Sequence, residues 1–297
     1  MKAIVEHISS RLSDIYGEDE ALALAWWIAE ELTGLTRTQL QFGCKDTKNI
    51  PNFQIDDPKL AEIIARLRRF EPIQYIFGHT LWAGLDLKLT SAILIPRPET
   101  AELVERLSTF NFQLSTAPVK VLDIGTGSGC IAIALKKRHP EWQITGIDIS
   151  AEAIEVAQEN ARRNNVDVNF VQADIFSDSI GRNDKLQITG YNLVVSNPPY
   201  ICESEKSSMR PNVLDFEPHT ALFVPDSDPL RFYQRIAQLF SLPPREKGRE
   251  RGFLFFEINE AYSADLSAML DGLGYTDIQI HNDVYGKPRI IQGRMAR

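Results

Sequence analysis

The sequence predicts a doubly wound α/β sheet that ends in an antiparallel hairpin and follows a small all-helical domain. From Val119 onward, apolar segments of strand length alternate with segments of helical periodicity, which is typical of a parallel sheet covered by helices. Near the C-terminus, two strand-like segments flank Asp283–Pro288 and indicate a hairpin. Residues up to about Phe70 show helical spacing. The expected divisions are residues 1–75 (helical domain), 76–100 (hairpin and connector) and 101–297 (α/β domain).

The N-terminal domain is expected to be helical because its apolar residues recur at three- and four-residue spacings. The first apolar face consists of Ile4, Ile8, Leu12 and Ile15. Gly34 is placed to end a second helix, and Asp57 and Pro58 are placed to begin another as N-cap and first helical residue. Trp26 and Trp27 are expected to belong to the core of this domain.

The strands and helices of the α/β domain are expected from their periodicity and composition. The expected strands are Val119–Ile124, Gln143–Ile147, Val168–Gln172, Asn192–Ser196 and Phe253–Ile258. The expected helices are Cys130–Lys137, Ala151–Asn164 and Leu230–Leu239, and the expected hairpin strands are Ile278–His281 and Arg289–Gln292. Leu81–Leu89 alternates like a strand or hairpin. The prolines of Ile93–Thr100 are expected to prevent regular structure, and Pro243–Arg251 is expected to be an exposed loop.

Charge and cysteine usage argue against several functional classes. The chain has 297 residues, a formal net charge of -8 and a pI of about 5.3, which disfavours a partner bound mainly through phosphates. Cys44, Cys130 and Cys202 lack the spacing of a disulfide framework or a zinc site, so no metal is expected. Met1 to Leu12 has no apolar segment of signal-peptide type, and no early apolar run is long enough to span a bilayer. These features predict a cytoplasmic protein that binds neither membranes nor nucleic acid directly.

A glycine-rich loop follows the first strand of the α/β domain and opens the next helix. The candidate cofactor-binding residues here are Asp123, Gly125, Thr126, Gly127, Ser128 and Gly129. Glycines let the backbone turn sharply and approach a ligand without interference from a Cβ atom. The spacing is G-x-G-x-G, whereas dinucleotide-binding loops have G-x-G-x-x-G. Asp123 precedes the turn, where a carboxylate attracts the ammonium group of a methionine-like ligand and repels a pyrophosphate.

Two further carboxylates are expected at the ends of the next two strands. Asp148 is placed to accept hydrogen bonds from both hydroxyls of a ribose, although it also precedes Ser150, a candidate N-cap of the next helix. Asp174 is placed to accept a hydrogen bond from an adenine amino group, with a solvated loop residue as the alternative. Ile175 is expected to offer that adenine an apolar face.

The segment Asn197-Pro198-Pro199-Tyr200 follows the fourth strand and is the most specific signal in the sequence. Its four residues are the candidate catalytic residues. Ligands of open α/β sheets bind at the carboxyl ends of the strands, so Asn197 is expected to border the cofactor as well as the acceptor. A Pro-Pro turn that merely leaves a strand is the alternative.

The chemistry that this segment suits is methylation of a planar NH2 group. Such a nitrogen is a poor nucleophile because its lone pair is delocalised. Hydrogen bonds from its two protons to the Asn197 side-chain oxygen and the Pro198 carbonyl favour a pyramidal nitrogen, and Pro199 helps to hold that carbonyl inward. The Tyr200 ring is expected to pack against the acceptor. No strong general base is needed before transfer.

Taken together, these residues resemble the HemK/PrmC family of protein-(glutamine-N5) methyltransferases, over nearly the whole chain. Further resembling segments are Pro72–Gly78, Ile95–Thr100, Glu217–Leu222 and Gly286–Arg289. The resemblance implies a class I S-adenosylmethionine-dependent methyltransferase fold with a seven-stranded sheet. It implies S-adenosylmethionine as cofactor, and as substrate the glutamine of the Gly-Gly-Gln motif of class-1 peptide chain release factors. The helical domain would then help to bind the release factor.

Two other functions are compatible with parts of the sequence. An adenine-N6 methyltransferase acting on DNA or RNA can use the same Asn-Pro-Pro-Tyr chemistry, but it needs a basic surface, and the net charge here is -8. A non-catalytic cofactor-binding module of the translation machinery is the second alternative, which the intact acceptor segment disfavours. The segment alone predicts a planar NH2 acceptor, and the family segments favour glutamine over adenine.

Overall fold

The computed structural model describes residues 2–42, 54–110, 118–177, 180, 190–241 and 252–295. Two compact units are formed by Met1–Gly78 with Pro211–Phe216, and by His79–Arg210 with Glu217–Arg297. The expected loop Pro243–Arg251 lies outside the described residues, as does Cys44. The functional domain boundaries expected after residues 75 and 100 stay predictions.

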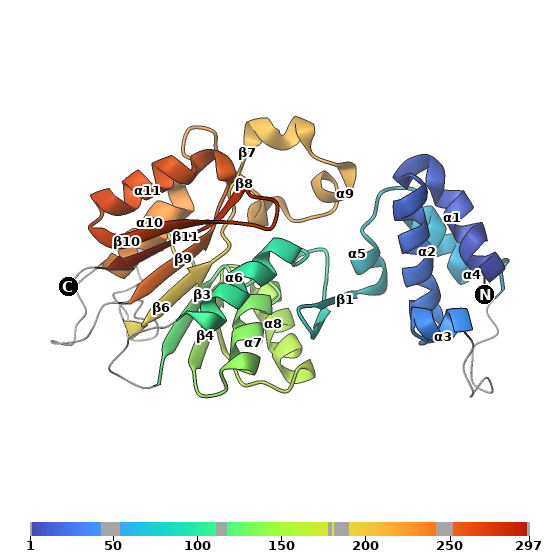
Figure 1. Cartoon of the computed structure of the whole chain (residues 1–297), viewed down its shortest axis with the longest axis horizontal. Coiled ribbons are helices and arrows are strands. Elements are labelled where there is room, and N and C mark those ends of the chain that lie inside the picture. Colours follow the sequence, from blue (N-terminus) through green and yellow to red (C-terminus); the bar gives the residue numbers. More distant parts are fainter. Residues whose placement is uncertain are drawn as a thin grey trace. The chain divides into compact units, whose positions relative to one another are not determined.

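Helices make up the described N-terminal part of the first unit. They are α1 (Lys2–Tyr16), α2 (Glu18–Thr33), α3 (Arg37–Phe42), α4 (Pro58–Leu67) and α5 (Ile73–Phe77), as labelled in Figure 1. Their apolar faces pack into one core, with Trp26 and Trp27 partly buried against it. Gly34 ends α2 in the left-handed conformation with φ 69°, and Asp57 caps α4 by accepting a hydrogen bond from the backbone N–H of Lys59. The expected helical N-terminal region is confirmed.

The described part of the second unit contains a seven-stranded sheet in the order β10-β11-β9-β6-β3-β4-β5. The strands are β3 (Lys120–Ile124), β4 (Gln143–Asp148), β5 (Asn169–Gln172), β6 (Leu193–Ser196), β9 (Phe253–Glu257), β10 (Tyr275–Asn282) and β11 (Pro288–Met295). Strands β9, β6, β3, β4 and β5 run parallel, whereas β11 pairs antiparallel with both β9 and β10. The predicted doubly wound sheet with its terminal hairpin is therefore confirmed (Figure 1).

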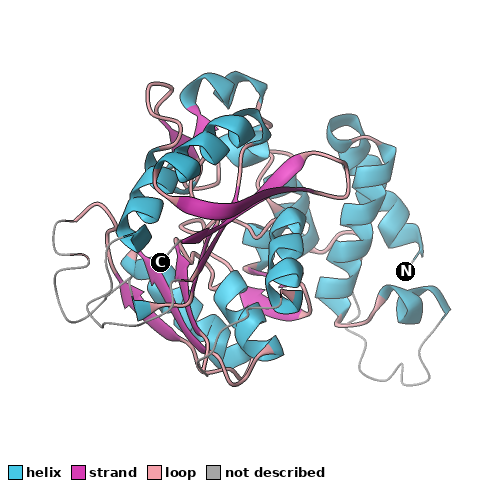
Figure 2. Ribbon diagram, turned by 60° about the vertical axis from the view of Figure 1, so that its left-hand side comes forward, coloured by secondary structure: helices cyan, strands magenta, loops and turns pink. Residues whose placement is uncertain are grey.

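Helices cover both faces of this sheet. One face packs against α6 (Pro98–Thr109), α7 (Cys130–Arg138), α8 (Ala151–Arg163) and the hairpin of β1 (His79–Trp82) and β2 (Leu85–Lys88). The other face packs against α10 (Arg231–Ser241) and α11 (Ser263–Gly272). The two helix layers can be followed in Figure 1 and, after a turn of 60°, in Figure 2.

The expectation that prolines keep Ile93–Thr100 irregular is wrong from Pro98 onward. Helix α6 begins at Pro98, because a proline in the first turn gives up an N–H that has no helical partner in any case. Thr100 is consequently held in the first turn of a helix, where it is buried. Helix α11 is a second difference, because it is not among the helices expected from sequence, although its buried Leu266 and Leu270 have helical spacing.

Replacing Gly252 by alanine is expected to destabilise the sheet. A Cβ atom at this position would lie 1.8 Å from the carbonyl oxygen of Asn192, which accepts the first backbone hydrogen bond of β9. Overpacking against a fixed backbone costs about 3 kcal/mol of unfolding free energy. Denaturant unfolding measures this loss. Gly272→Ala is the matched control, because its Cβ would meet nothing within 4 Å, and a loss as large for Gly272→Ala would contradict the steric argument.

Candidate active site

The expected site residues gather at the carboxyl edge of the parallel strands. Strands β3, β4, β5 and β6 are neighbours, and the pairing sets Ile124 beside Ile147 and Ser196, and Asp148 beside Gln172. Each strand is followed by one of the expected segments, so the glycine loop, the two later carboxylates and the Asn197 segment leave the sheet at one edge. Open α/β sheets bind their ligands at such an edge, where the strand order reverses.

The glycine loop adopts the tight conformation that its spacing predicts. Gly125, Gly127 and Gly129 have φ values of 70°, 53° and 80°, a region that residues with a Cβ atom rarely occupy. The backbone N–H groups of Gly125 and Thr126 both donate to the carbonyl of Ile147, each at 2.9 Å. This bifurcated contact fastens the loop to the end of β4.

The three glycines differ in what surrounds them. A Cβ atom at Gly129 would meet Ile133, Ala157 and Phe170 at 3.0 to 3.1 Å, whereas one at Gly125 would meet nothing within 4 Å. Gly129 therefore allows close packing of the helix that follows. The open space beside Gly125 is where a ligand can approach the backbone.

Asp123 is fully buried beneath this loop. The Thr126 hydroxyl donates to its Oδ2 atom at 2.7 Å. Its Oδ1 atom is buried and has no hydrogen-bond partner in the described part of the chain. Burial raises the pKa of Asp123 to about 7, against the lowering effect of the Thr126 hydrogen bond. An unpartnered buried carboxylate oxygen is costly, so this atom is suited to a cationic ligand group.

Asp148 connects the end of β4 to the glycine loop. Its Oδ2 atom accepts a hydrogen bond from the Gly127 N–H and its Oδ1 atom accepts one from the Ser150 N–H, both at 2.9 Å. Ser150 is also the N-cap of α8, since its hydroxyl accepts a hydrogen bond from the Ala153 N–H. The interpretation of Ser150 as an N-cap is confirmed, whereas the ribose role of Asp148 stays a prediction. Each Asp148 oxygen retains a further lone pair for a ligand hydroxyl.

The loop after β5 buries Ile175, contrary to the expectation of an exposed apolar face, whereas the role expected of Asp174 stays a prediction. Asp174 is half-buried, and its Oδ1 atom accepts a hydrogen bond from the Phe176 N–H at 2.8 Å. Ile175 is only 8% exposed and belongs to the core under α10 and α11, which leaves it little surface for an adenine. Ile149, directly after Asp148, is 63% exposed. The sequence pattern that could have pointed to Ile149 as an exposed apolar residue of the site is its position immediately after Asp148, the carboxylate that ends β4.

Two loop residues predicted to bind the cofactor are buried within the protein. Thr126 is 4% exposed and its hydroxyl is engaged by Asp123. Ser128 is 2% exposed, and its carbonyl accepts a hydrogen bond from Asn160 Nδ2 at 2.9 Å. Their side chains hold the loop in shape, and a cofactor role for them stays a prediction.

The Asn197 segment begins where β6 ends, and the Ser196 hydroxyl fixes that end by donating to the Ile124 carbonyl at 2.7 Å. Asn197 is half-buried and its Nδ2 atom donates to Thr100 Oγ1 at 3.2 Å. In the described part of the chain no hydrogen bond is recorded for Asn197 Oδ1. Pro198 is buried and Tyr200 half-buried, with the Tyr200 ring packed against the core under α10.

Glu257 is a residue of this site that sequence reasoning missed. It ends β9, is 1% exposed, and accepts hydrogen bonds from the Thr100 hydroxyl at 2.7 Å and from the Tyr200 hydroxyl at 3.3 Å. Burial raises the pKa of Glu257, while the Thr100 hydrogen bond and the Arg289 charge lower it. The available signal was a charged residue at the end of the apolar strand Phe253–Glu257.

Three further family segments take part in ion pairs whose carboxylates are buried. Glu217 accepts hydrogen bonds from the Ile95 N–H at 3.1 Å and from the Arg97 guanidinium at 2.7 Å. These two hydrogen bonds join the Ile95–Thr100 segment to the Glu217–Leu222 segment. The Glu217 side chain is 1% exposed. In the terminal hairpin, Arg289 contacts the buried carboxylate of Asp283 at 3.3 Å.

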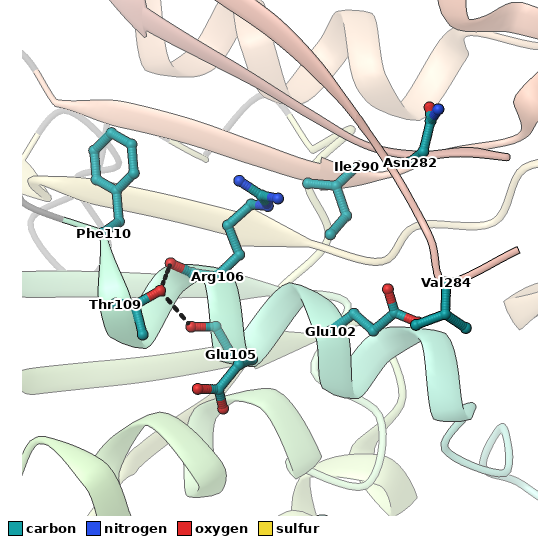
Figure 3. A pocket seen from close by; sticks show the side chains of 8 residues that line it. All are labelled: Glu102, Glu105, Arg106, Thr109, Phe110, Asn282, Val284 and Ile290. Carbon is teal, nitrogen blue, oxygen red and sulfur yellow. Dashed lines mark hydrogen bonds between the residues drawn. The ribbon is translucent and has the colours of Figure 1, made fainter. Parts of the chain in front are cut away.

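A hollow of about 500 Å³ lies between α6 and the β10–β11 hairpin (Figure 3). Its lining residues are Glu102, Glu105, Arg106, Thr109, Phe110, Asn282, Val284 and Ile290. None of the expected cofactor or acceptor residues lines it, so it is distinct from the candidate active site.

The described residues also bear on metal and membrane binding. They include no cluster of three or more His, Cys, Asp or Glu side chains arranged to hold a metal ion. The expectation of no metal stays a prediction. None of the described helices has the length and apolar character that a membrane span requires.

The strand order, the glycine loop and the carboxylates at the strand ends define the class I methyltransferases. Comparison with known families agrees: residues 100–213 match the methyltransferase small domain, and residues 3–78 match the PrmC N-terminal domain. The hMettl16 catalytic domain, solved in complex with the MAT2A 3′UTR hairpin 6, shares the fold with a TM-score of 0.52 at 16% identity, over 80% of this chain and 81% of that one.

Two relatives match almost end to end. The release factor glutamine methyltransferase of Bacteroides thetaiotaomicron is 42% identical over 98% of this chain and 99% of its own. The release factor glutamine methyltransferase of Flavobacterium psychrophilum is 35% identical over 95% of this chain and 94% of its own. The chain therefore belongs to the release factor glutamine methyltransferase family.

Proposed function

We propose that the protein transfers a methyl group from S-adenosylmethionine to the side-chain amide nitrogen (N5) of a glutamine in class-1 peptide chain release factors, within their Gly-Gly-Gln motif. The observation that carries this proposal is the full-length match to release factor glutamine methyltransferases, at up to 42% identity. The Asn197–Tyr200 segment supports the same reaction, because it leaves the sheet at the edge that carries the glycine loop.

The residues at the carboxyl edge of the parallel strands fit S-adenosylmethionine. S-adenosylmethionine supplies a methyl group on a positively charged sulfur. Asp123 Oδ1, buried without a partner in the described part of the chain, is suited to the ammonium group. Asp148 accepts one backbone N–H at each oxygen and has lone pairs left for two ribose hydroxyls. We assign Asp174 to the adenine amino group and the exposed Ile149 to the adenine face.

Asn197 and Pro198 prepare the acceptor nitrogen. The amide protons of the substrate glutamine donate to Asn197 Oδ1 and to the Pro198 carbonyl, which favours a pyramidal nitrogen with its lone pair available. The Tyr200 ring covers the acceptor. The nitrogen gains a methyl group and afterwards loses one proton, which leaves readily because the methylated nitrogen is strongly acidic.

The helical unit is the part of the chain that we assign to binding the release factor. Its match to the PrmC N-terminal domain over residues 3–78 supports this assignment. The protein would then act in translation termination, in the cytoplasm, on a protein substrate and without direct contact to nucleic acid. The net charge of -8 supports a protein partner over DNA or RNA.

Cofactor affinity is expected to rise with pH. Because burial raises the pKa of Asp123 to about 7, this side chain is mostly protonated below that pH and must release its proton to pair with an ammonium group. From about pH 6 to 7, affinity should rise about fivefold, because the deprotonated fraction of Asp123 rises from about a tenth to about a half. In the absence of cofactor, the raised pKa contributes stability that is full below the ordinary pKa of 3.8 and is lost as pH rises through 7.

At pH 6, calorimetry in two buffers of different ionisation enthalpy measures this effect as release of about one proton on binding. Asp123→Asn is the control, since its amide cannot titrate, and its affinity should be weak and independent of pH. Equal proton release by wild type and Asp123→Asn would exclude Asp123 as the titrating group.

The proposed function is tested by offering two acceptors with the same labelled cofactor. The protein is incubated with labelled S-adenosylmethionine and either a class-1 release factor or adenine-containing DNA. Transfer to the release factor is expected. Label on adenine alone would establish the nucleic-acid alternative, and cofactor binding without transfer to either acceptor would favour a non-catalytic module.

A further inference from the structure

A chain of buried hydrogen bonds runs from the acceptor segment to the end of β9. Asn197 Nδ2 lies 3.2 Å from Thr100 Oγ1, and Thr100 Oγ1 lies 2.7 Å from Glu257 Oε2. Thr100 and Glu257 are 2% and 1% exposed, so water does not compete for the contact between them, whereas Asn197 is half-buried. The two residues come from α6 and β9, which meet beside the end of β6.

The direction of each hydrogen bond in this chain is set by chemistry. A carboxylate only accepts hydrogen bonds, and a threonine hydroxyl has one proton to donate. Glu257 accepts from Thr100 at one oxygen and from the Tyr200 hydroxyl at the other, which is the arrangement a carboxylate requires. Because the Thr100 proton is donated to Glu257, Thr100 can only accept from Asn197.

This polarity selects one of the two orientations of the Asn197 amide. Its NH2 group faces Thr100, and its Oδ1 atom is turned away, without a hydrogen-bond partner among the described residues. The opposite orientation would place Asn197 Oδ1 against Thr100 Oγ1, whose single proton is already donated to Glu257, so two acceptor oxygens would face each other without a proton between them. An Asn197 amide turned in that way would also present protons to the protons of the substrate amide.

We propose that Thr100 and Glu257 are positioning residues for methyl transfer, which fix the Asn197 amide with its oxygen toward the acceptor nitrogen. Neither residue contacts the reacting atoms. Their effect reaches the reaction through the orientation of Asn197. The inference rests on the proposed function for its reaction, whereas the orientation itself can be measured without any substrate.

Removal of the Thr100 hydroxyl is the first test. Thr100→Val keeps the shape of the side chain, and we expect turnover to fall about 100-fold, with KM and cofactor affinity within about threefold of wild type. Thr100→Ser restores a hydroxyl and should recover turnover to within about threefold. Thr109→Val is the matched control on the same helix: its hydroxyl bonds the carbonyls of Glu105 and Arg106, and its loss should leave turnover unchanged.

Glu257→Gln tests whether the Glu257 carboxylate sets the direction of the hydrogen bonds between Glu257, Thr100 and Asn197. The glutamine amide can donate a hydrogen bond to Thr100 and so release the Thr100 proton toward Asn197. We expect turnover to fall about as far as in Thr100→Val, with unfolding temperature and cofactor affinity reported alongside as checks of folding. Turnover within about threefold of wild type in both folded variants would overturn the proposal.

Coupling to Asn197 distinguishes positioning from a general structural effect. If Thr100 acts through Asn197, the double variant Thr100→Val/Asn197→Ala should be no slower than Asn197→Ala alone. Additive losses would overturn the proposal, because they would show that Thr100 acts independently of Asn197.

The substrate-free test is the NMR signal of the Asn197 side-chain NH2 group in the full chain. Its protons should exchange slowly in wild type and Thr100→Ser, and rapidly in Thr100→Val. If the NH2 protons exchange slowly in wild type and rapidly in Thr100→Val, but the protein does not methylate release factors, the orienting role is retained and the proposed function is overturned. Identical exchange in wild type and Thr100→Val would overturn the orienting role, whatever the substrate.

Discussion

Replacing Asn197 by alanine is expected to lower turnover about 1,000-fold while cofactor affinity stays within about threefold of wild type. The alanine removes the oxygen that accepts a hydrogen bond from the acceptor amide, so the nitrogen remains planar and its lone pair delocalised. Steady-state kinetics with a release factor measure turnover, and calorimetry measures cofactor binding separately.

A control variant, and the comparison of turnover with cofactor affinity, make this result specific to the acceptor site. Asn169→Ala removes an exposed asparagine at the opposite, amino end of β5 and should leave both quantities unchanged. Near-normal methylation by Asn197→Ala would contradict the acceptor role. A loss of cofactor affinity as large as the loss of turnover would mean that Asn197 acts mainly in cofactor binding.

Replacing Asp148 by alanine is expected to weaken cofactor binding about 100-fold, since two hydrogen bonds to a charged acceptor contribute a few kcal/mol. The change also removes the contacts with the N–H groups of Gly127 and Ser150, which loosens the glycine loop. Turnover at saturating cofactor should recover most of the wild-type value. Calorimetry measures the affinity directly.

The control for Asp148 is Asp167→Ala, an exposed carboxylate before β5 at the other edge of the sheet. It should bind the cofactor like wild type. Asp148→Asn keeps an acceptor oxygen and is expected to fall between the alanine variant and wild type. Unchanged affinity in Asp148→Ala would exclude the ribose role, and the Ser150 cap would then be the main purpose of this carboxylate.

The candidate cofactor residues at the carboxyl edge of the parallel strands could be proposed from sequence, because the patterns that indicate them are local. The glycine spacing after a strand, and Asp148 at the end of the next strand, are short patterns whose meaning depends on a few neighbouring residues. The hydrogen bond between the Gly127 N–H and Asp148 then follows from the parallel pairing of β3 with β4. The sheet class could be predicted for a similar reason, since alternation of strands and helices restricts the topology.

The orienting residues could not be predicted because they depend on distant pairings. Thr100 and Glu257 are separated by 157 residues and meet because β9 lies next to β6 and α6 begins at Pro98. The same limit applies to two apolar residues that follow strand ends. Ile175, after β5, belongs to the core that includes α10, whereas Ile149, after β4, is exposed. A local pattern cannot say which of two apolar residues the tertiary structure will cover.

Asn197 and the Gly-Gly-Gln glutamine are tested together by locating the transferred methyl group, using tandem mass spectrometry of a release factor treated with the protein and S-adenosylmethionine. We expect one methyl group on the side-chain nitrogen of the glutamine in the Gly-Gly-Gln peptide, present with wild type and nearly absent with Asn197→Ala. A methyl group on another residue, or an unmodified release factor alongside methylated adenine in added DNA, would contradict this expectation.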